Sequence, residues 1–134
     1  MFDKEEFERW MAQASNTLIS ARQDYAAKSF NWCCFNAQQA AEYAVKALLK
    51  GLGISVYGHS IVKLLRDLET YEPNLGGLPS CARTLDRHYV PARYPDAFTE
   101  GSPFEFYDDK TALEALNCAE KICDFCIIFG RKYE

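Results

Sequence analysis

The stretch from Ser29 to Leu52 constrains the fold more than any other part of the chain, because it is apolar on nearly every face of a helix. A helix of this kind has to be covered on several sides, so the stretch predicts a central helix with neighbours around it. Gly51 and Gly53 end the pattern, since glycine adopts the left-handed conformation that closes a helix. The apolar residues of the stretch are Trp32, Cys33, Phe35, Ala37, Ala40, Ala41, Ala44, Val45, Leu48 and Leu49.

Four further segments carry helical spacing or helix-start signals and supply the covering helices. Asp3, followed three positions later by Glu6, resembles a capping box, and Ser60 is suited to cap another helix. We expect helices over residues 3–27, 29–52, 60–71, 79–91 and 108 or 109–132, with an ordered loop over residues 91–106. No alternating strand pattern occurs, so the predicted fold class is all-α, an antiparallel up-and-down bundle of four or five helices.

Length and composition indicate one globular domain over residues 1–134. A chain of 134 residues is long enough to bury one core, and 49% hydrophobic residues with only seven Gly and five Pro are typical of a globular protein. The start of the chain, MFDKEEFERW, is acidic where a signal peptide would be basic and then apolar, and no stretch approaches eighteen uncharged apolar residues. We therefore expect a soluble, cytoplasmic protein.

The six cysteines are interpreted as reduced, mostly buried thiols, because most of them lie within helical patterns. Cys118, Cys123 and Cys126 copy the spacing of a plant-type ferredoxin ligand run. Such a loop is irregular, whereas this segment is a helix pattern without Gly or Pro, so we interpret Cys123 and Cys126 as core residues one helical turn apart. We expect no metal and no cofactor.

Three segments together resemble the bacterial and archaeal HEPN family. They are QQAAEYAVKALL at residues 38–49, GHSIVKLL at 58–65 and LDRHYVPARYPDAF at 85–98, of which the third is the most specific. The resemblance implies a helical bundle, frequent homodimers, and a minimal nucleotidyltransferase partner in toxin–antitoxin-like pairs. Some family members are metal-independent ribonucleases and others bind nucleotides, so the family alone does not select a function.

The ribonuclease branch of the family carries an Arg followed four to six residues later by His, and Arg83 and His88 fit that spacing. Arginine can stabilise a pentavalent phosphate while histidine transfers a proton. The sequence departs from the pattern of this branch at two positions. The apolar Leu85 follows where a polar residue is usual after the Arg, and Val90 stands two residues after His88, where some toxins carry Tyr. We favour the non-catalytic interpretation of Arg83 and His88.

The segment from Arg83 to Asp96 allows a structural and a functional interpretation. In the structural one, which is slightly favoured, Pro95 holds Tyr94 extended, Asp96 bonds nearby amides, and Arg93 pairs with Asp96 or Asp86. In the functional one, positive charge gathers at a helix end beside rings on which a base could stack. The candidate nucleotide- or RNA-binding residues of this segment are Arg87, Tyr89, Arg93, Tyr94 and Asp96, with Arg83 adding charge.

Two other places hold polar residues that could bind a ligand. Gln38, Glu42 and Lys46 share one face of the central helix, and we interpret Glu42 and Lys46 as a satisfied intrahelical pair. His59 precedes the Ser60 cap, where a structural hydrogen bond is the default and a phosphate contact at the helix N-terminus is the alternative.

The sequence therefore predicts a HEPN homodimer that binds nucleotide or RNA phosphate near Arg83 to Asp96, as partner of a nucleotidyltransferase. The net charge of −4 requires a local basic cluster for this, because it argues against bulk attraction to nucleic acid. The alternatives are a non-catalytic protein–protein interaction module and a ribonuclease that uses Arg83 and His88. The dimer is expected because six large residues exceed what one small core can hide: Trp10, Trp32, Phe35, Phe104, Phe106 and Phe129.

Overall fold

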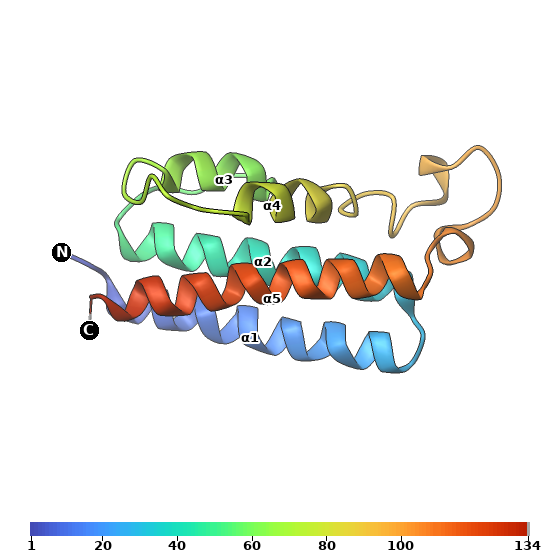
Figure 1. Ribbon diagram of the computed structural model, residues 1–134, viewed down its shortest axis with the longest axis horizontal. Helices are drawn as coiled ribbons and strands as arrows, with labels where there is room; N and C mark the ends of the chain where they lie inside the picture. The colour runs from blue at the N-terminus through green and yellow to red at the C-terminus, as the bar shows by residue number, and fades with distance from the viewer. Residues whose placement is uncertain (134) are drawn as a thin grey trace.

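The computed structural model describes residues 1–133, which form five α-helices, two short 3-10 helices and no strand. The helices are α1 (Lys4–Ala26), α2 (Phe30–Gly51), α3 (Ile61–Leu68), α4 (Leu78–Asp86) and α5 (Asp109–Arg131), with η1 (Pro95–Ala97) and η2 (Pro103–Phe106) between α4 and α5. Helix α1 runs antiparallel to α2 and α5, α3 runs antiparallel to α4, and α3 and α4 lie along one side of α2 (Figure 1). The predicted all-α antiparallel bundle is confirmed.

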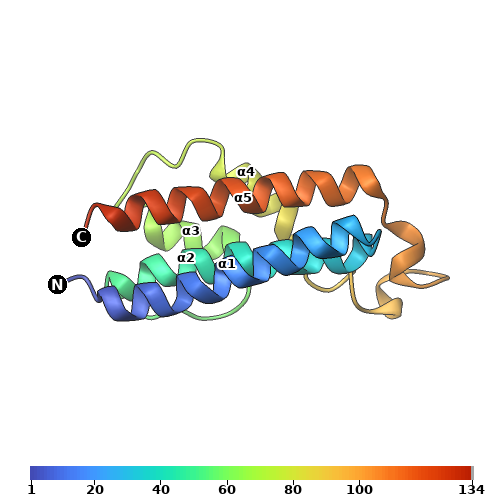
Figure 2. The same cartoon turned by 90° about the horizontal axis from the view of Figure 1, so that it is seen from below.

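Helix α2 is the central helix that its apolar pattern predicts. It packs against α1, α3, α4 and α5, and Figure 2 shows it among the other helices from a second direction. Ala37, Ala40, Ala44 and Leu48 are fully buried. The small side chains of the three alanines let neighbouring helices approach α2 closely, so one continuous core runs along its length.

Helix starts are fixed by side chains three residues away. The carboxylate of Asp3 accepts a hydrogen bond from the Glu6 amide at 3.1 Å, and the hydroxyl of Ser60 accepts one from the Lys63 amide at 3.2 Å. Both caps were expected from the sequence and are confirmed, since each satisfies an amide that has no partner within the helix.

The fourth helix is shorter than predicted, because α4 ends at Asp86 and does not continue to Pro91. In an α-helix the ring of Pro91 would clash with the carbonyl of Arg87, four residues earlier. The chain instead forms tight turns over residues 87–93, with hydrogen bonds from the His88 amide to the Leu85 carbonyl and from the Arg93 amide to the Val90 carbonyl. These turns set the direction of every candidate side chain after Asp86.

The cysteines are free thiols, and five of the six are buried. Burial raises the pKa of Cys33 and of Cys123 to about 12, so these thiols stay protonated near neutral pH. Cys123 and Cys126 lie in α5 as part of the core, as the sequence predicts. Only Cys118 is partly exposed.

The two described ends of the chain meet at one end of the bundle, and the loop between α4 and α5 projects from the other (Figure 1). The rings of Phe2 and Tyr133 stack with centroids 4.3 Å apart, and the Asp3 amide donates to the Gly51 carbonyl at 2.7 Å. In the projecting loop, Phe98 stacks on Phe106 at 4.4 Å. Within residues 1–133, no helix is long and apolar enough to cross a lipid bilayer.

Candidate functional site

The three segments that resemble HEPN sequences meet where the middle of α2 faces the start of α3 and the end of α4. The side-chain amide of Gln38 in α2 joins them, because it donates to the His59 carbonyl at 2.8 Å and lies 3.2 Å from the Asp86 carboxylate. Residues that are far apart in the sequence are thereby brought to one place.

The carboxylate of Asp86, the last residue of α4, lies at the N-terminus of α3. It accepts hydrogen bonds from the amides of Ile61 and Val62, both at 3.0 Å, and from the Ser60 hydroxyl at 3.1 Å. These are the donors that a phosphate would need at this helix end. The structural alternative therefore holds for the helix N-terminus, and any contact of His59 with a ligand must be made by its side chain.

Glu42 lies at the centre of a polar cluster that extends from the core to the surface, called here the Glu42 network, which comprises Gln38, Gln39, Glu42, Lys46 and His59. Its carboxylate is within 3.0 Å of the Lys46 ammonium, 3.2 Å of His59 Nδ1 and 3.2 Å of the Gln39 amide nitrogen. Only 1% of the Glu42 side chain is exposed. The predicted intrahelical pair is confirmed, and the structure adds His59 to it.

His59 lies flat on Tyr89. The two ring centroids are 4.7 Å apart with planes 16° from parallel, and 54% of the His59 side chain is exposed. Both rings border a shallow hollow of about 270 Å³. Its lining residues are His59, Ser60, Asp86, Tyr89, Val90 and Pro91.

Arg93 rests on three aromatic rings, an arrangement called here the Arg93 platform. Its guanidinium carbon lies 4.3 Å from the ring centroid of Phe35, 4.6 Å from that of Tyr89 and 4.9 Å from that of Tyr94. Its Nε donates to the Tyr89 carbonyl at 2.9 Å. Cation–π attraction and this hydrogen bond hold the guanidinium in place, and no carboxylate of residues 1–133 pairs with it.

The structural interpretation of the Arg93 segment is correct in one part and wrong in another. Tyr94 is extended, with φ −112° and ψ 121°, as expected for a residue before proline. The predicted ion pair of Arg93 with Asp96 or Asp86 is absent among residues 1–133, because Asp86 is bonded to the start of α3 and the side chain of Asp96 makes no hydrogen bond there.

The side chain of His88 contacts the segment just before α5. Its Nδ1 lies 2.9 Å from the Tyr107 hydroxyl, and burial lowers the pKa of His88 while it raises the pKa of Tyr107 to about 12. Both groups are therefore uncharged near neutral pH. Within the described part of the chain, no hydrogen bond joins His88 to Arg83, which is exposed on α4.

Comparison with known proteins agrees with this architecture. A sequence model of the HEPN domain matches residues 7–131. The chain belongs to the HEPN domain family. Solved structures similar to this HEPN domain include TT1696 from Thermus thermophilus, with 39% identity and a TM-score of 0.86, covering 90% of this chain and 94% of that one. Another is ST0689, an archaeal HEPN homologue, with 38% identity and a TM-score of 0.79, covering 92% and 97%.

Two further relatives extend the comparison. A HEPN domain protein from Thermotoga maritima is 34% identical with a TM-score of 0.73, covering 90% of this chain and 96% of that one. Human sacsin is 28% identical over an alignment 124 residues long, which covers 84% of this chain. The chain spans 3% of the length of sacsin.

In this HEPN domain, the last turn of α4 and the turns after it carry three arginine side chains. Arg83 and Arg87 are exposed, Arg93 is partly exposed, and none of the three takes part in an ion pair among residues 1–133. Tyr94 is 50% exposed next to Arg93. Guanidinium groups beside accessible aromatic rings are suited to hold a phosphate and an adjoining base.

Proposed function

We propose that this HEPN domain binds a nucleotide or RNA through its phosphate at the Arg83 to Asp96 segment. The observation that carries the proposal is the Arg93 platform, in which a charged group is held by three rings and has no carboxylate partner within residues 1–133. An arginine whose position is already fixed loses little conformational entropy when it binds an anion. Arg83 and Arg87 add attraction from the same end of α4.

The aromatic residues around Arg93 support nucleotide over simple phosphate as the ligand. Tyr94 is half exposed, and the Tyr89 ring borders the hollow beside His59. Stacking of a base on an aromatic ring contributes about 1–3 kcal/mol per base. A ligand that has both a phosphate and a base would use both kinds of group.

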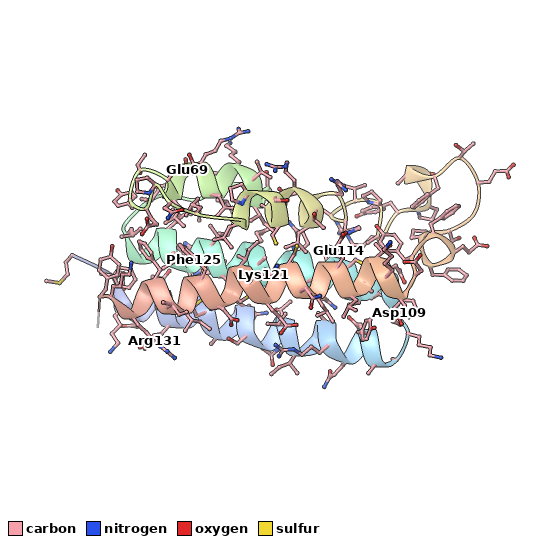
Figure 3. All side chains as sticks on the ribbon, in the orientation of Figure 1. Glu69, Asp109, Glu114, Lys121, Phe125 and Arg131 are labelled. Carbon is pink, nitrogen blue, oxygen red and sulfur yellow. The ribbon has the colours of Figure 1, made fainter. Side chains whose placement is uncertain are left out.

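Replacing Arg93 with Ala is expected to weaken binding of AMP and of a short RNA at least about tenfold, since a hydrogen bond to a charged group contributes about 1.5–3 kcal/mol. Fluorescence anisotropy with labelled RNA and calorimetry with AMP measure this loss, and circular dichroism checks that helical content is retained. Arg131→Ala is the matched control, because Arg131 is exposed at the opposite end of α5 from Asp109 (Figure 3).

A different result would show that Arg93 only braces its loop. In that case Arg93→Ala lowers the melting temperature because the bond to the Tyr89 carbonyl and the ring contacts are lost, and the affinity of the folded protein for either ligand does not change. Absence of any RNA or nucleotide binding by the wild-type protein would leave the protein–protein interaction module as the surviving alternative.

We also propose that the domain forms a homodimer. Of the six large residues singled out from the sequence, Phe129 is buried, whereas Trp32, Phe104 and Phe106 are 46%, 69% and 54% exposed. Helix α2 begins at the end of the bundle from which the loop projects, so Trp32 and the loop aromatics lie toward the same end (Figure 1). Exposed aromatic groups of this size favour association.

Analytical ultracentrifugation at micromolar protein is expected to show a dimer. Changing Phe104 and Phe106 together to Ser should shift the protein toward monomer, because it removes apolar area that association would bury. Ile19→Ser, on the exposed side of α1, is the control for general loss of surface hydrophobicity. A wild-type monomer would contradict the proposal.

The nucleotidyltransferase partner is a proposal that rests on the family. Co-expression of this chain with a minimal nucleotidyltransferase, followed by size-exclusion chromatography, tests whether the two proteins form a complex.

A further inference from the structure

Glu42 is a charged residue that no ligand can reach, yet its contacts extend to the surface. It is 1% exposed in the middle of α2, and its carboxylate contacts the Lys46 ammonium and His59 Nδ1. A buried carboxylate that accepts several hydrogen bonds is held in one position. It can therefore orient a neighbour that is itself accessible.

His59 is that neighbour, and two contacts fix its ring. An ionised carboxylate only accepts hydrogen bonds, so Nδ1 must donate the proton to Glu42. Stacking on Tyr89 fixes the ring plane, with 16° between the two rings. In neutral His59 the other ring nitrogen, Nε2, then carries the lone pair, and it makes no hydrogen bond with residues 1–133.

Tyr89 links His59 to the Arg93 platform. The His59 ring centroid lies 4.7 Å from that of Tyr89, and the Arg93 guanidinium carbon lies 4.6 Å from the same ring. The Nε of Arg93 also donates to the Tyr89 carbonyl. The side chains of His59 and Arg93 thus both contact one tyrosine, whose ring borders the hollow.

We infer that Glu42 positions His59 as a second phosphate contact beside Arg93, so that RNA binds more tightly when His59 is protonated. The inference rests on the proposed function of the Arg93 platform. Protonation turns Nε2 from an acceptor, which repels a phosphate oxygen, into a donor that bonds to it. Binding is therefore strengthened as the pH falls through the range in which histidine becomes charged, and weakened as the pH rises through it.

The charged groups around His59 agree with this sign. Glu42 is balanced by Lys46 in α2, and the Asp86 carboxylate is bonded to Gln38 and to the start of α3. Histidine is the residue type in this cluster whose charge ordinarily changes between about pH 5 and 8.

The test uses an oligouridylate with hydroxyl ends, whose phosphodiesters and bases keep a constant charge across this range. Wild-type protein is expected to bind it about tenfold more tightly at about pH 5.5 than at about pH 8, the gain from one charge-assisted hydrogen bond. His59→Gln should bring the ratio of the two dissociation constants close to one. The chain has two histidines, so His88→Gln is the matched control and should keep the wild-type ratio.

The role of Glu42 is tested by the double variant Glu42→Met/Lys46→Met, which removes both buried charges and leaves neither unpaired. It should lower the ratio toward one, because His59 loses the acceptor that orients it. A double variant with the wild-type ratio would overturn the positioning role.

The two proposals fail in different ways. If Arg93→Ala binds the oligonucleotide as well as wild type does, the proposed function is wrong. The inference about His59 is overturned, and the proposed function stands, if Arg93→Ala weakens binding but the wild-type dissociation constants at the two pH values are nearly equal. The same holds if His88→Gln abolishes the pH dependence of binding and His59→Gln does not.

Discussion

Glu42→Ala is expected to lower the free energy of unfolding by about 3–5 kcal/mol, because it leaves the Lys46 ammonium buried without its partner. The Lys46 side chain is 11% exposed, and the Glu42 carboxylate 3.0 Å away is the group that balances it. His59 and the glutamine amides lose an acceptor at the same time. Urea unfolding followed by circular dichroism measures the loss.

The chain contains a matched control for this prediction. Lys4 and Glu8 also form a Lys–Glu pair with i, i+4 spacing, 3.8 Å apart, but their side chains are 59% and 60% exposed. Glu8→Ala should therefore change stability by no more than about 1 kcal/mol. Glu42→Met/Lys46→Met should recover most of the stability that Glu42→Ala loses, since apolar residues replace the pair. Equal losses for Glu42→Ala and Glu8→Ala would contradict the importance of burial.

Gly130→Val is expected to destabilise the fold by about 2–3 kcal/mol, in the upper part of the range for overpacking. Gly130 lies in α5 directly against Phe7 of α1, and an added Cβ would overlap Phe7 Cζ and stand 2.6 Å from Cε1. The Phe7 ring is 7% exposed and packs near Phe2, with centroids 5.4 Å apart, so it has little room to move. Thermal and urea unfolding both report the change.

Gly77→Val serves as the control, because Gly77 has a negative φ of −83° and an added Cβ would meet nothing within 4 Å. Gly77 is the N-cap residue of α4, where valine is less favoured than glycine, so the effect of the substitution should stay within about 1 kcal/mol. Combining Gly130→Val with Phe7→Leu should cost less than the sum of the two single changes, since the smaller side chain makes space. Additive losses would show that Phe7 and Gly130 do not interact as described.

The sequence predicted well the features that depend on residues close to one another in the chain. The caps at Asp3 and Ser60 bond to amides three residues away, and the Glu42–Lys46 pair spans one helical turn. The central position of α2 followed from its apolar pattern alone. In each case the interacting groups lie within one turn or on one helix, so spacing decides the outcome.

The candidate site depended on contacts that no spacing reveals. His59 lies seventeen residues after Glu42 in the sequence, and Asp86 lies twenty-five residues after Ile61, whose amide it bonds. Charge alone favoured a carboxylate partner for Arg93, but the turns after α4 direct its side chain onto aromatic rings instead. A signal did exist for the Glu42 network: the charged residues Glu42 and Lys46 lie in the middle of a helix that is apolar on nearly every face, which indicates buried charges with partners elsewhere.

The meeting of the chain ends, where Phe2 stacks on Tyr133, has a consequence for how such a domain can be joined to other proteins. Domains whose ends lie close together tolerate insertion into a host chain and circular permutation, because the host needs only a short gap to accept them. The ends are at the opposite end of the bundle from the projecting loop (Figure 1). A host protein, a tag or a solid support attached there would leave the Arg93 platform facing solution, which makes tethered binding measurements practical.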